Sequence, residues 1–147
     1  MESYQILEIN NFNILLLLGL AEEADAGGYL FVQKTITEWN DGTNNFSKPG
    51  EKLWGIFIAD ECIGIGGLNQ DPYVNDKTIG RVRHLYISKK YRGLGLSKLL
   101  MQLIVNKAKE NFTTLRLSTQ NPVADSLYES LGFTKTTGEK VTHIMKF

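Results

Sequence analysis

The chain is 147 residues long and carries 16 basic and 16 acidic side chains, so its formal net charge is zero. That length fits one domain, and we expect residues 1–147 to fold as a single unit. The balanced charge argues against a nucleic-acid partner and against attachment to a membrane surface through charge.

The N-terminal part of the chain predicts a short strand followed by two helices. Residues 4–9 alternate loosely between apolar and polar side chains, which favours a strand. Helices are expected over residues 14–24 and 29–39. The apolar run at residues 14–18 is too short to cross a membrane, and acidic residues surround it, which argues against a secretory signal.

The middle of the chain predicts a β-hairpin. Residues 53–59 and 62–68 are apolar and β-prone, with a turn between them. Cys62, the only cysteine, opens the second of these strands, so an internal disulfide is impossible and a cytoplasmic location is expected. No activating partner is visible in the sequence, so we interpret Cys62 as a small buried residue rather than a nucleophile.

The C-terminal half continues with alternating strands and helices. Strands are expected over residues 79–88 and 115–118, with a long helix to about Asn111 between them. A helix from Pro122 to about Leu131 and two final strands follow. The order is β-α-α-β-β-β-α-β-α-β-β. It predicts an α/β fold (α+β mixed), with a mixed central sheet and helices on both faces.

A glycine-rich stretch, residues 91–98, connects the strand at residues 79–88 to the long helix. The first N–H groups of a helix have no partners inside the helix, and the helix dipole adds partial positive charge there. Glycines such as Gly93 and Gly95 let an anion approach the backbone closely. The stretch therefore predicts a site for a pyrophosphate group, although a plain strand–helix turn would also explain these two glycines.

Two common phosphate motifs do not fit this stretch. A P-loop needs glycine, four other residues and then Gly-Lys-Ser/Thr, a spacing that the chain lacks. The dinucleotide-binding motif needs a third glycine where Lys98 stands, and an acidic residue in the next strand. Residues 115–118 contain no acid, so a nicotinamide-type cofactor is disfavoured.

A second pattern lies downstream and consists of Asn121, Ala124, Tyr128, Gly132 and Phe133. Together with Arg92-Gly93-Leu94-Gly95-Leu96-Ser97, it resembles the GNAT superfamily of acetyl-CoA-dependent N-acetyltransferases. The family patterns are Arg/Gln-x-x-Gly-x-Gly/Ala and Asn-x-x-Ala-x-x-x-Tyr-x-x-x-Gly-Phe, and both occur here in the right order. Ser97 departs from the first pattern but is still small. The resemblance covers residues 79–147 well and the N-terminal half only by element order.

The resemblance implies that acetyl-CoA serves as co-substrate and contacts three groups of residues. The pyrophosphate would bind to the glycine-rich loop, which consists of Arg92, Gly93, Leu94, Gly95, Leu96, Ser97 and Lys98. The strand residues Leu85, Tyr86 and Ile87 match a bulged strand whose freed backbone groups bind the pantetheine arm and polarise the thioester carbonyl. The third group is Asn121, Ala124 and Tyr128; for Asn121, a helix N-cap is an equally compatible role.

Tyr128 matches the residue that protonates the departing thiolate, and no metal is implied. Many relatives place an acid before the matched strand residues, where this chain has Arg81, Val82 and Arg83. His84 is then a possible general base, with a structural or substrate-positioning role as the alternative. His143 is a weaker candidate that could pair with His84.

The acceptor is left open between two chemistries. Asp71 and Asp76 would suit a polycationic amine, whereas Arg81 and Arg83 would suit an acceptor with a carboxylate or phosphate. The implied function is N-acetylation of a small molecule or peptide amine by direct attack. A non-catalytic acyl-CoA-binding sensor or partner-binding module is the alternative, and acyl chains longer than acetyl are compatible with the pattern. By analogy with the family, the protein would be a monomer or homodimer.

Overall fold

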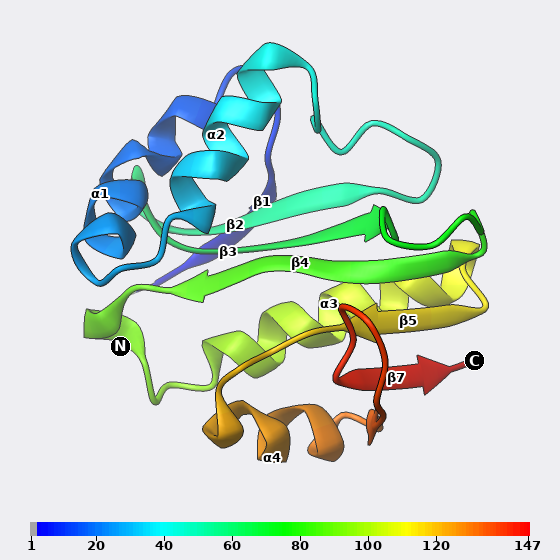
Figure 1. The fold of residues 1–147 in the computed structure, drawn as a ribbon. Helices are drawn as coiled ribbons and strands as arrows, with labels where there is room; N and C mark the ends of the chain where they lie inside the picture. The colour runs from blue at the N-terminus through cyan, green and yellow to red at the C-terminus, as the bar shows by residue number, and fades with distance from the viewer. Residues whose placement is uncertain (1–2) are drawn as a thin grey trace.

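A mixed sheet of seven strands, in the order β1-β2-β3-β4-β5-β7-β6, runs through residues 3–147, the part of the chain that the computed structural model describes (Figure 1). Antiparallel pairing joins β1 to β2, β2 to β3 and β3 to β4, and also joins β7 to β5 and β6; β4 and β5 are parallel. The strands are β1 (Gln5–Glu8), β2 (Lys52–Ile58), β3 (Glu61–Gln70), β4 (Ile79–Ile87), β5 (Thr114–Leu117), β6 (Thr134–Lys135) and β7 (His143–Lys146).

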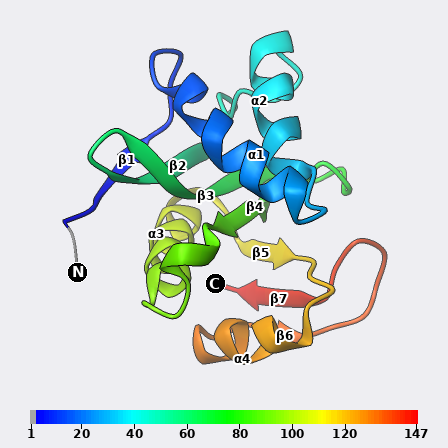
Figure 2. The same ribbon diagram turned by 90° about the vertical axis from the view of Figure 1, so that its left-hand side faces the viewer.

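Helices cover both faces of this sheet (Figure 2). One face carries the 3-10 helix η1 (Ile14–Leu17), α1 (Leu18–Ala26) and α2 (Phe31–Asp41). The other face carries α3 (Leu96–Asn111) and α4 (Pro122–Ser130). Two buried apolar clusters lie between the layers, one beneath each pair of helices. The predicted fold class and element order are confirmed.

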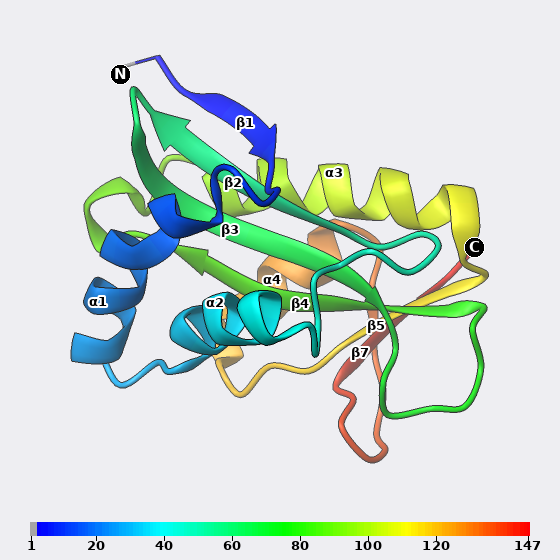
Figure 3. The same cartoon turned by 90° about the horizontal axis from the view of Figure 1, so that it is seen from above.

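The central strands β2 and β3 are buried almost throughout because helices lie over both of their faces. Glycines in β3 make this packing close. A Cβ on Gly67 would come within 2.6 Å of the Phe46 ring, so only glycine fits there. Viewed from above, α1 and α2 cross over β3 and β4 but leave β5 and β7 uncovered (Figure 3).

A β-bulge interrupts β4 and decides which side chains reach which face. Gly67 pairs with Arg83 and Ile65 pairs with Tyr86, so Gly66 alone opposes two residues of β4. His84, one of those two, has a left-handed backbone with φ of 57°. Simple alternation would place Val82 with His84 and Tyr86. The extra residue changes this. Val82, Leu85 and Ile87 pack on the α3 side, while Arg83, His84 and Tyr86 lie on the α1/α2 side.

Candidate active site

A gap opens between β4 and β5. The two strands pair only where residues 79–81 meet residues 114–116, and they then diverge (Figure 1). At the far end of β4, the Ser88 N–H donates to the Ile63 oxygen of β3 at 2.8 Å. Because the backbone of successive strand residues faces alternate sides, Ile87 directs its N–H and C=O groups away from β3 and into the gap. Leu85 lies in the bulge of β4, where backbone groups are freed from the regular ladder beside the same gap. The gap therefore offers backbone donors and acceptors to an extended ligand.

The glycine-rich loop lies at the end of this gap, between the short 3-10 helix η2 (Lys89–Tyr91) and α3. Gly93 and Gly95 have φ of 80° and 81°, a conformation that favours glycine. Gly95 is the N-cap of α3, and its carbonyl accepts the first helical bond, from the Leu99 N–H at 3.1 Å. The N–H groups of residues 96–98 consequently have no partners inside the helix. A Cβ at either glycine would meet nothing within 4 Å among the described residues, so the loop faces open space. Its chemistry and shape fit a phosphate group.

Arg92 braces the start of this loop. Its Nε donates to the Ile87 oxygen at 2.9 Å, and its guanidinium lies 5.3 Å from the centre of the Tyr86 ring. The side chain therefore connects the end of β4 to the loop and also leaves positive charge beside the predicted phosphate site.

Glu23 of α1 is a site residue that the sequence did not reveal. Its carboxylate accepts hydrogen bonds from the hydroxyls of Tyr86 and Ser88, both at 2.6 Å, and from the Lys89 N–H at 3.3 Å. Partial burial by itself would raise the pKa of Glu23, but these hydrogen bonds and the charge of Arg92 outweigh it and lower the pKa. Glu23 thus fixes the segment from which the loop departs. Its partners are more than 60 residues away, and no local spacing signals them.

Asn121 and Tyr128 are brought to the same side of the sheet by α4. The Asn121 Oδ1 accepts from the Val123 N–H at 3.0 Å, so this residue does cap the helix, and its Nδ2 can still donate elsewhere. Tyr128 is 8% exposed and belongs to the same apolar cluster as Ile87 and Leu96. Burial raises the pKa of the Tyr128 hydroxyl, so it carries its proton at neutral pH and can donate it.

His84 lies at the bulge beside α2. Its Nδ1 is 2.6 Å from the Thr35 Oγ1, and that hydroxyl donates its hydrogen to the Phe31 oxygen at 2.7 Å. We therefore assign the imidazole hydrogen to Nδ1, with the Nε2 lone pair free to accept. Burial first, and then the positive charges of Arg83 and Lys34, lower the pKa of His84 from 6.5 to about 3. The ring is neutral at physiological pH and weakly basic, which speaks against the predicted role as general base.

His143 is separate from His84. Its Nδ1 lies 2.8 Å from the Thr142 Oγ1, and its Nε2 lies 3.2 Å from Asp125. The ring is 1% exposed and borders a pocket of about 390 Å³ at the start of α4. The suggestion that the two histidines form a pair is wrong, because each is held by a different set of partners.

Three of the four residues suggested for acceptor binding are committed elsewhere. The Asp71 Oδ2 lies 3.1 Å from the Arg81 Nε and 3.3 Å from the Arg116 Nε, and the three side chains are buried or nearly so. Both arginines also donate through Nη2 to backbone oxygens of the β6–β7 loop, at Lys140 and Glu139. Asp71 and Arg81 are therefore structural. The carboxylate of Asp76 accepts hydrogen bonds from the N–H and the hydroxyl of Thr78. Of the four residues suggested for acceptor binding, this leaves Arg83.

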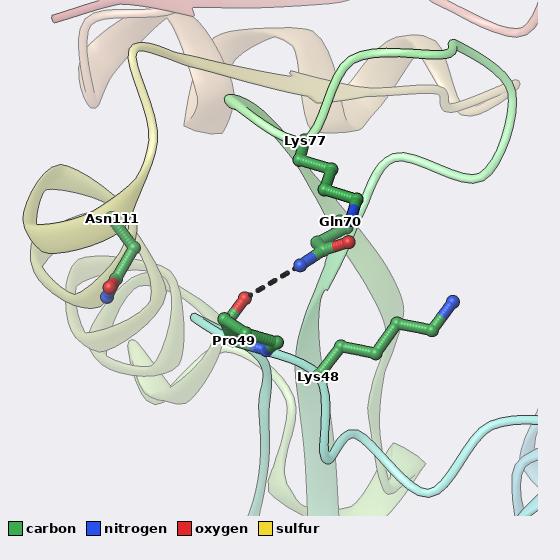
Figure 4. A pocket seen from close by; sticks show the side chains of 5 residues that line it. All are labelled: Lys48, Pro49, Gln70, Lys77 and Asn111. Carbon is green, nitrogen blue, oxygen red and sulfur yellow. Dashed lines mark hydrogen bonds between the residues drawn. The ribbon is translucent and has the colours of Figure 1, made fainter.

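A second pocket, of about 420 Å³, lies beside the C-terminal end of α3, the end opposite the glycine-rich loop (Figure 4). Its lining includes Gln70, whose Nε2 donates to the Pro49 oxygen at 3.1 Å (Figure 4). It shares no residue with the site. Cys62 is buried, and burial raises its pKa to about 12, so it is not a reactive thiol.

Neither a metal cluster nor a membrane-spanning helix is found in the part of the chain that the structure describes. Within residues 3–147, no group of three or more His, Cys, Asp or Glu side chains could hold a metal ion. The helices formed by these residues are also too short or too polar to cross a membrane.

The sequence profile of the Acetyltransferase (GNAT) domain matches residues 22–147 of the chain. The chain belongs to the GNAT acetyltransferase family. The resemblance drawn from the glycine-rich loop and the Asn121–Phe133 pattern is thereby confirmed. Human N-acetyltransferase 8B is 30% identical over 114 residues, which cover 74% of this chain but only 49% of the human protein. The GNAT domain described here thus spans about half the length of that relative.

Solved structures share the fold over almost the whole chain. A crystal structure from Exiguobacterium sp. 255-15 superposes with a TM-score of 0.86 at 24% identity, covering 98% of this chain and 93% of that one. The Salmonella typhimurium protein yncA, solved with its cofactor acetyl-CoA, has a TM-score of 0.73 at 11% identity and covers 99% of this chain and 94% of its own. At these identities the likeness establishes the GNAT fold.

Proposed function

We propose that this GNAT domain transfers an acetyl group from acetyl-CoA to an amine by direct attack. The observation that carries the proposal is the continuity of the site: the gap between β4 and β5 leads to the loop at Gly93–Gly95 and to the free N–H groups of residues 96–98 at the start of α3. A linear ligand with a pyrophosphate fits that arrangement. The neighbour yncA, which shares the fold and was solved with acetyl-CoA, supports the same ligand.

Each part of the proposed ligand has residues suited to it. The pyrophosphate would bind to the N–H groups of residues 93–98, with Arg92 adding charge. The pantetheine arm would lie along the backbone of Leu85 and Ile87. It would occupy the place beside β4 where β5 no longer pairs with it. The Nδ2 of Asn121 would donate to the same arm from the start of α4.

The proposed chemistry is acyl transfer without an acyl-enzyme. The amine nitrogen attacks the thioester carbon, forming a C–N bond, and the carbonyl oxygen becomes an oxyanion. A backbone N–H facing the gap stabilises that charge. The C–S bond then breaks, and Tyr128 gives its proton to the sulfur. The nitrogen, which became positively charged when the neutral amine attacked, then loses a second proton, and this proton restores the tyrosine by way of water.

Deprotonating the attacking amine is a substantial part of the barrier. An amine with a pKa near 10.4 requires roughly 4–5 kcal/mol to lose its proton at pH 7. Because His84 has a pKa of about 3, we favour release of this proton to solvent over transfer to His84.

An acceptor screen tests the function. The protein is incubated with acetyl-CoA and amino acids, polyamines, aminoglycosides or peptides, and free coenzyme A thiol is measured. We expect acetyl-CoA to raise the melting temperature and thiol to appear with at least one amine. Stabilisation without thiol release would favour the acyl-CoA-binding module instead. A melting temperature that saturating acetyl-CoA leaves unchanged would overturn both functions. The raised pKa of buried Cys62 keeps background thiol low.

A further inference from the structure

Arg83 is a cation without a carboxylate partner beside the proposed transfer point. Its side chain is half-buried on the α1/α2 face of β4, with Nη2 3.5 Å from the His84 Nε2. Among residues 3–147, no Asp or Glu forms a salt bridge with it. Arg81, two residues earlier on the same strand, has Asp71 at 3.1 Å. The strand thus carries one neutralised arginine and one that is free to bind an anion.

The bulge places this free charge close to the acceptor rather than along the donor. Leu85 lies in the bulge beside the gap where the thioester would lie, and a bulge frees backbone groups from the ladder. His84 and Arg83 precede it directly, and both point to the opposite layer, where α2 contributes Thr35 and Lys34. A group bound to the Arg83 guanidinium would therefore lie on the α2 side of the thioester, and the donor would occupy the gap itself.

The surroundings of Arg83 combine positive charge with aromatic rings. Arg83 and Lys34 both disfavour a second positive charge at His84, and they would act in the same way on a cationic acceptor. Phe31 lies 5.9 Å from the His84 ring and 6.0 Å from the Tyr86 ring, measured between ring centres. Glu23 of α1, an acid on this face, is occupied by Tyr86, Ser88 and Lys89. This environment suits a small acceptor with an anionic group and an apolar side chain.

We propose that the acceptor carries a carboxylate near its amine, as an amino acid does, and that Arg83 binds this carboxylate. The inference rests on the proposed acetyl transfer and specifies its substrate class. The guanidinium presents two parallel N–H donors that match a carboxylate. The bound carboxylate supplies the counter-charge that Arg83 lacks, and it holds the amine beside the thioester. Polyamines and lysine-rich peptides are poor acceptors, since they bring positive charge to a positive site.

Matched acceptor pairs test this assignment. Each amino acid that releases thiol in the acceptor screen is compared with its carboxamide, which removes the charge of the carboxylate. Because the carboxamide also lowers the pKa of the neighbouring amine, kcat/KM is expressed per concentration of unprotonated amine for both acceptors. Wild-type protein is expected to prefer the acid by about tenfold or more in kcat/KM, the scale of a charged hydrogen bond. R83M should reduce that preference to within about twofold and leave the KM for acetyl-CoA unchanged. R83K keeps the positive charge but lacks the two parallel N–H donors of the guanidinium, so its preference for the acid should lie between those of wild type and R83M. An R83M variant that keeps the full preference, or a wild type that prefers the carboxamide, overturns the proposal.

A binding measurement separates this proposal from the proposed function. Protein saturated with coenzyme A is titrated with an N-acetyl amino acid and with its N-acetyl carboxamide, the two products. An Arg83-dependent preference for the acid supports the carboxylate site even if no amine releases thiol, in which case acetyl transfer alone has failed. Equal affinity for the two ligands in wild type and R83M overturns the carboxylate site whatever the turnover. Melting temperatures of each variant with and without acetyl-CoA verify that the fold and the donor site are intact.

Discussion

The Tyr128 hydroxyl is the group on which the proposed departure of the thiolate depends. The ring packs edge-to-face against Phe133 and His143, with centres 6.0 and 5.4 Å apart, and phenylalanine would preserve that packing. Tyr128→Phe should therefore fold normally and lower kcat by about 10²-fold, the smaller end of general-acid effects. The dissociation constant for acetyl-CoA should change little. Steady-state kinetics and titration with acetyl-CoA measure the two quantities, and an unchanged kcat would remove Tyr128 as the acid.

His84 should make the protein sensitive to mild acid. Its pKa is about 3 when folded and 6.5 in the reference state, so between these values the unfolded chain binds the extra proton. The titration of His84 therefore costs the fold nothing above pH 6.5. As the pH falls from 6.5 toward 3, it lowers the free energy of unfolding by at most about 1.4 kcal/mol per pH unit. Urea unfolding at pH 6.5 and pH 5 should show this loss. Glu23, whose pKa is lowered from 4.5, acts at lower pH.

A matched variant isolates the His84 effect. His84→Asn does not titrate, and asparagine tolerates the left-handed backbone at φ of 57° better than most residues do. The variant should lose clearly less stability than wild type between pH 6.5 and pH 5. Parallel losses in the two proteins would show that His84 does not keep its depressed pKa.

The residues of the candidate site differ in how far the sequence could predict them. Gly93, Gly95 and Tyr128 belong to local patterns, so their spacing along the chain was enough to place them on the loop and on α4. Glu23 reaches partners 63 and 65 residues away, and such contacts depend on how α1 packs on the sheet. The weak basicity of His84 likewise follows from burial and from its neighbours, which its position in a strand does not reveal.

At the scale of elements, the glycine-rich loop should bind the donor through its left-handed residues. Gly95→Ala forces a Cβ onto a backbone with φ of 81°, a cost of roughly 1–2 kcal/mol, and adds a methyl group facing the proposed phosphate. We expect the dissociation constant for acetyl-CoA to rise about tenfold or more, measured by calorimetry. The kcat at saturating donor should stay within a few-fold of wild type, because the loop is distant from the thioester.

Gly42 offers a control with the same local conformation. It ends α2 with φ of 82°, and a Cβ there would also meet nothing within 4 Å among the described residues. Gly42→Ala should therefore cost similar stability and leave acetyl-CoA binding unchanged. Equal weakening of acetyl-CoA binding by both variants would attribute the effect to general strain rather than to the loop.

Whether a segment forms a helix or a strand was predictable, because the spacing of apolar residues is a property of the local sequence. The order of helices and strands along the chain then predicted a sheet with helices on both faces. The bulge at His84 was only implied by the family pattern. Strand alternation alone predicts that Val82 and His84 share a face of the sheet, whereas the bulge puts them on opposite faces. The point where β4 and β5 separate is set by tertiary packing, so no run of residues in either strand marks it.

At the scale of the whole molecule, one buried charge cluster holds the two sides of the gap together. Arg81 of β4 and Arg116 of β5 are register partners at the last position where the two strands still pair. Two like charges directly opposite each other repel, and Asp71, from the end of β3, lies against both guanidiniums. The same arginines hold the β6–β7 loop. The cluster therefore connects four segments at the apex of the gap.

Removing the carboxylate charge of Asp71 should weaken the whole fold. Asp71→Asn keeps the shape of the side chain but leaves two buried guanidiniums unneutralised, for which we expect a loss of about 3–5 kcal/mol in the free energy of unfolding. Urea denaturation measures the loss. Replacing all three charges at once, as D71L/R81M/R116M, should recover much of it, because well-packed apolar residues often replace a buried ion cluster without penalty. A loss below about 1 kcal/mol for Asp71→Asn would show that the two arginines find enough counter-charge in the carbonyls of the β6–β7 loop. In that case the carbonyls of the β6–β7 loop, rather than Asp71, would stabilise the two arginines at the point where β4 and β5 separate.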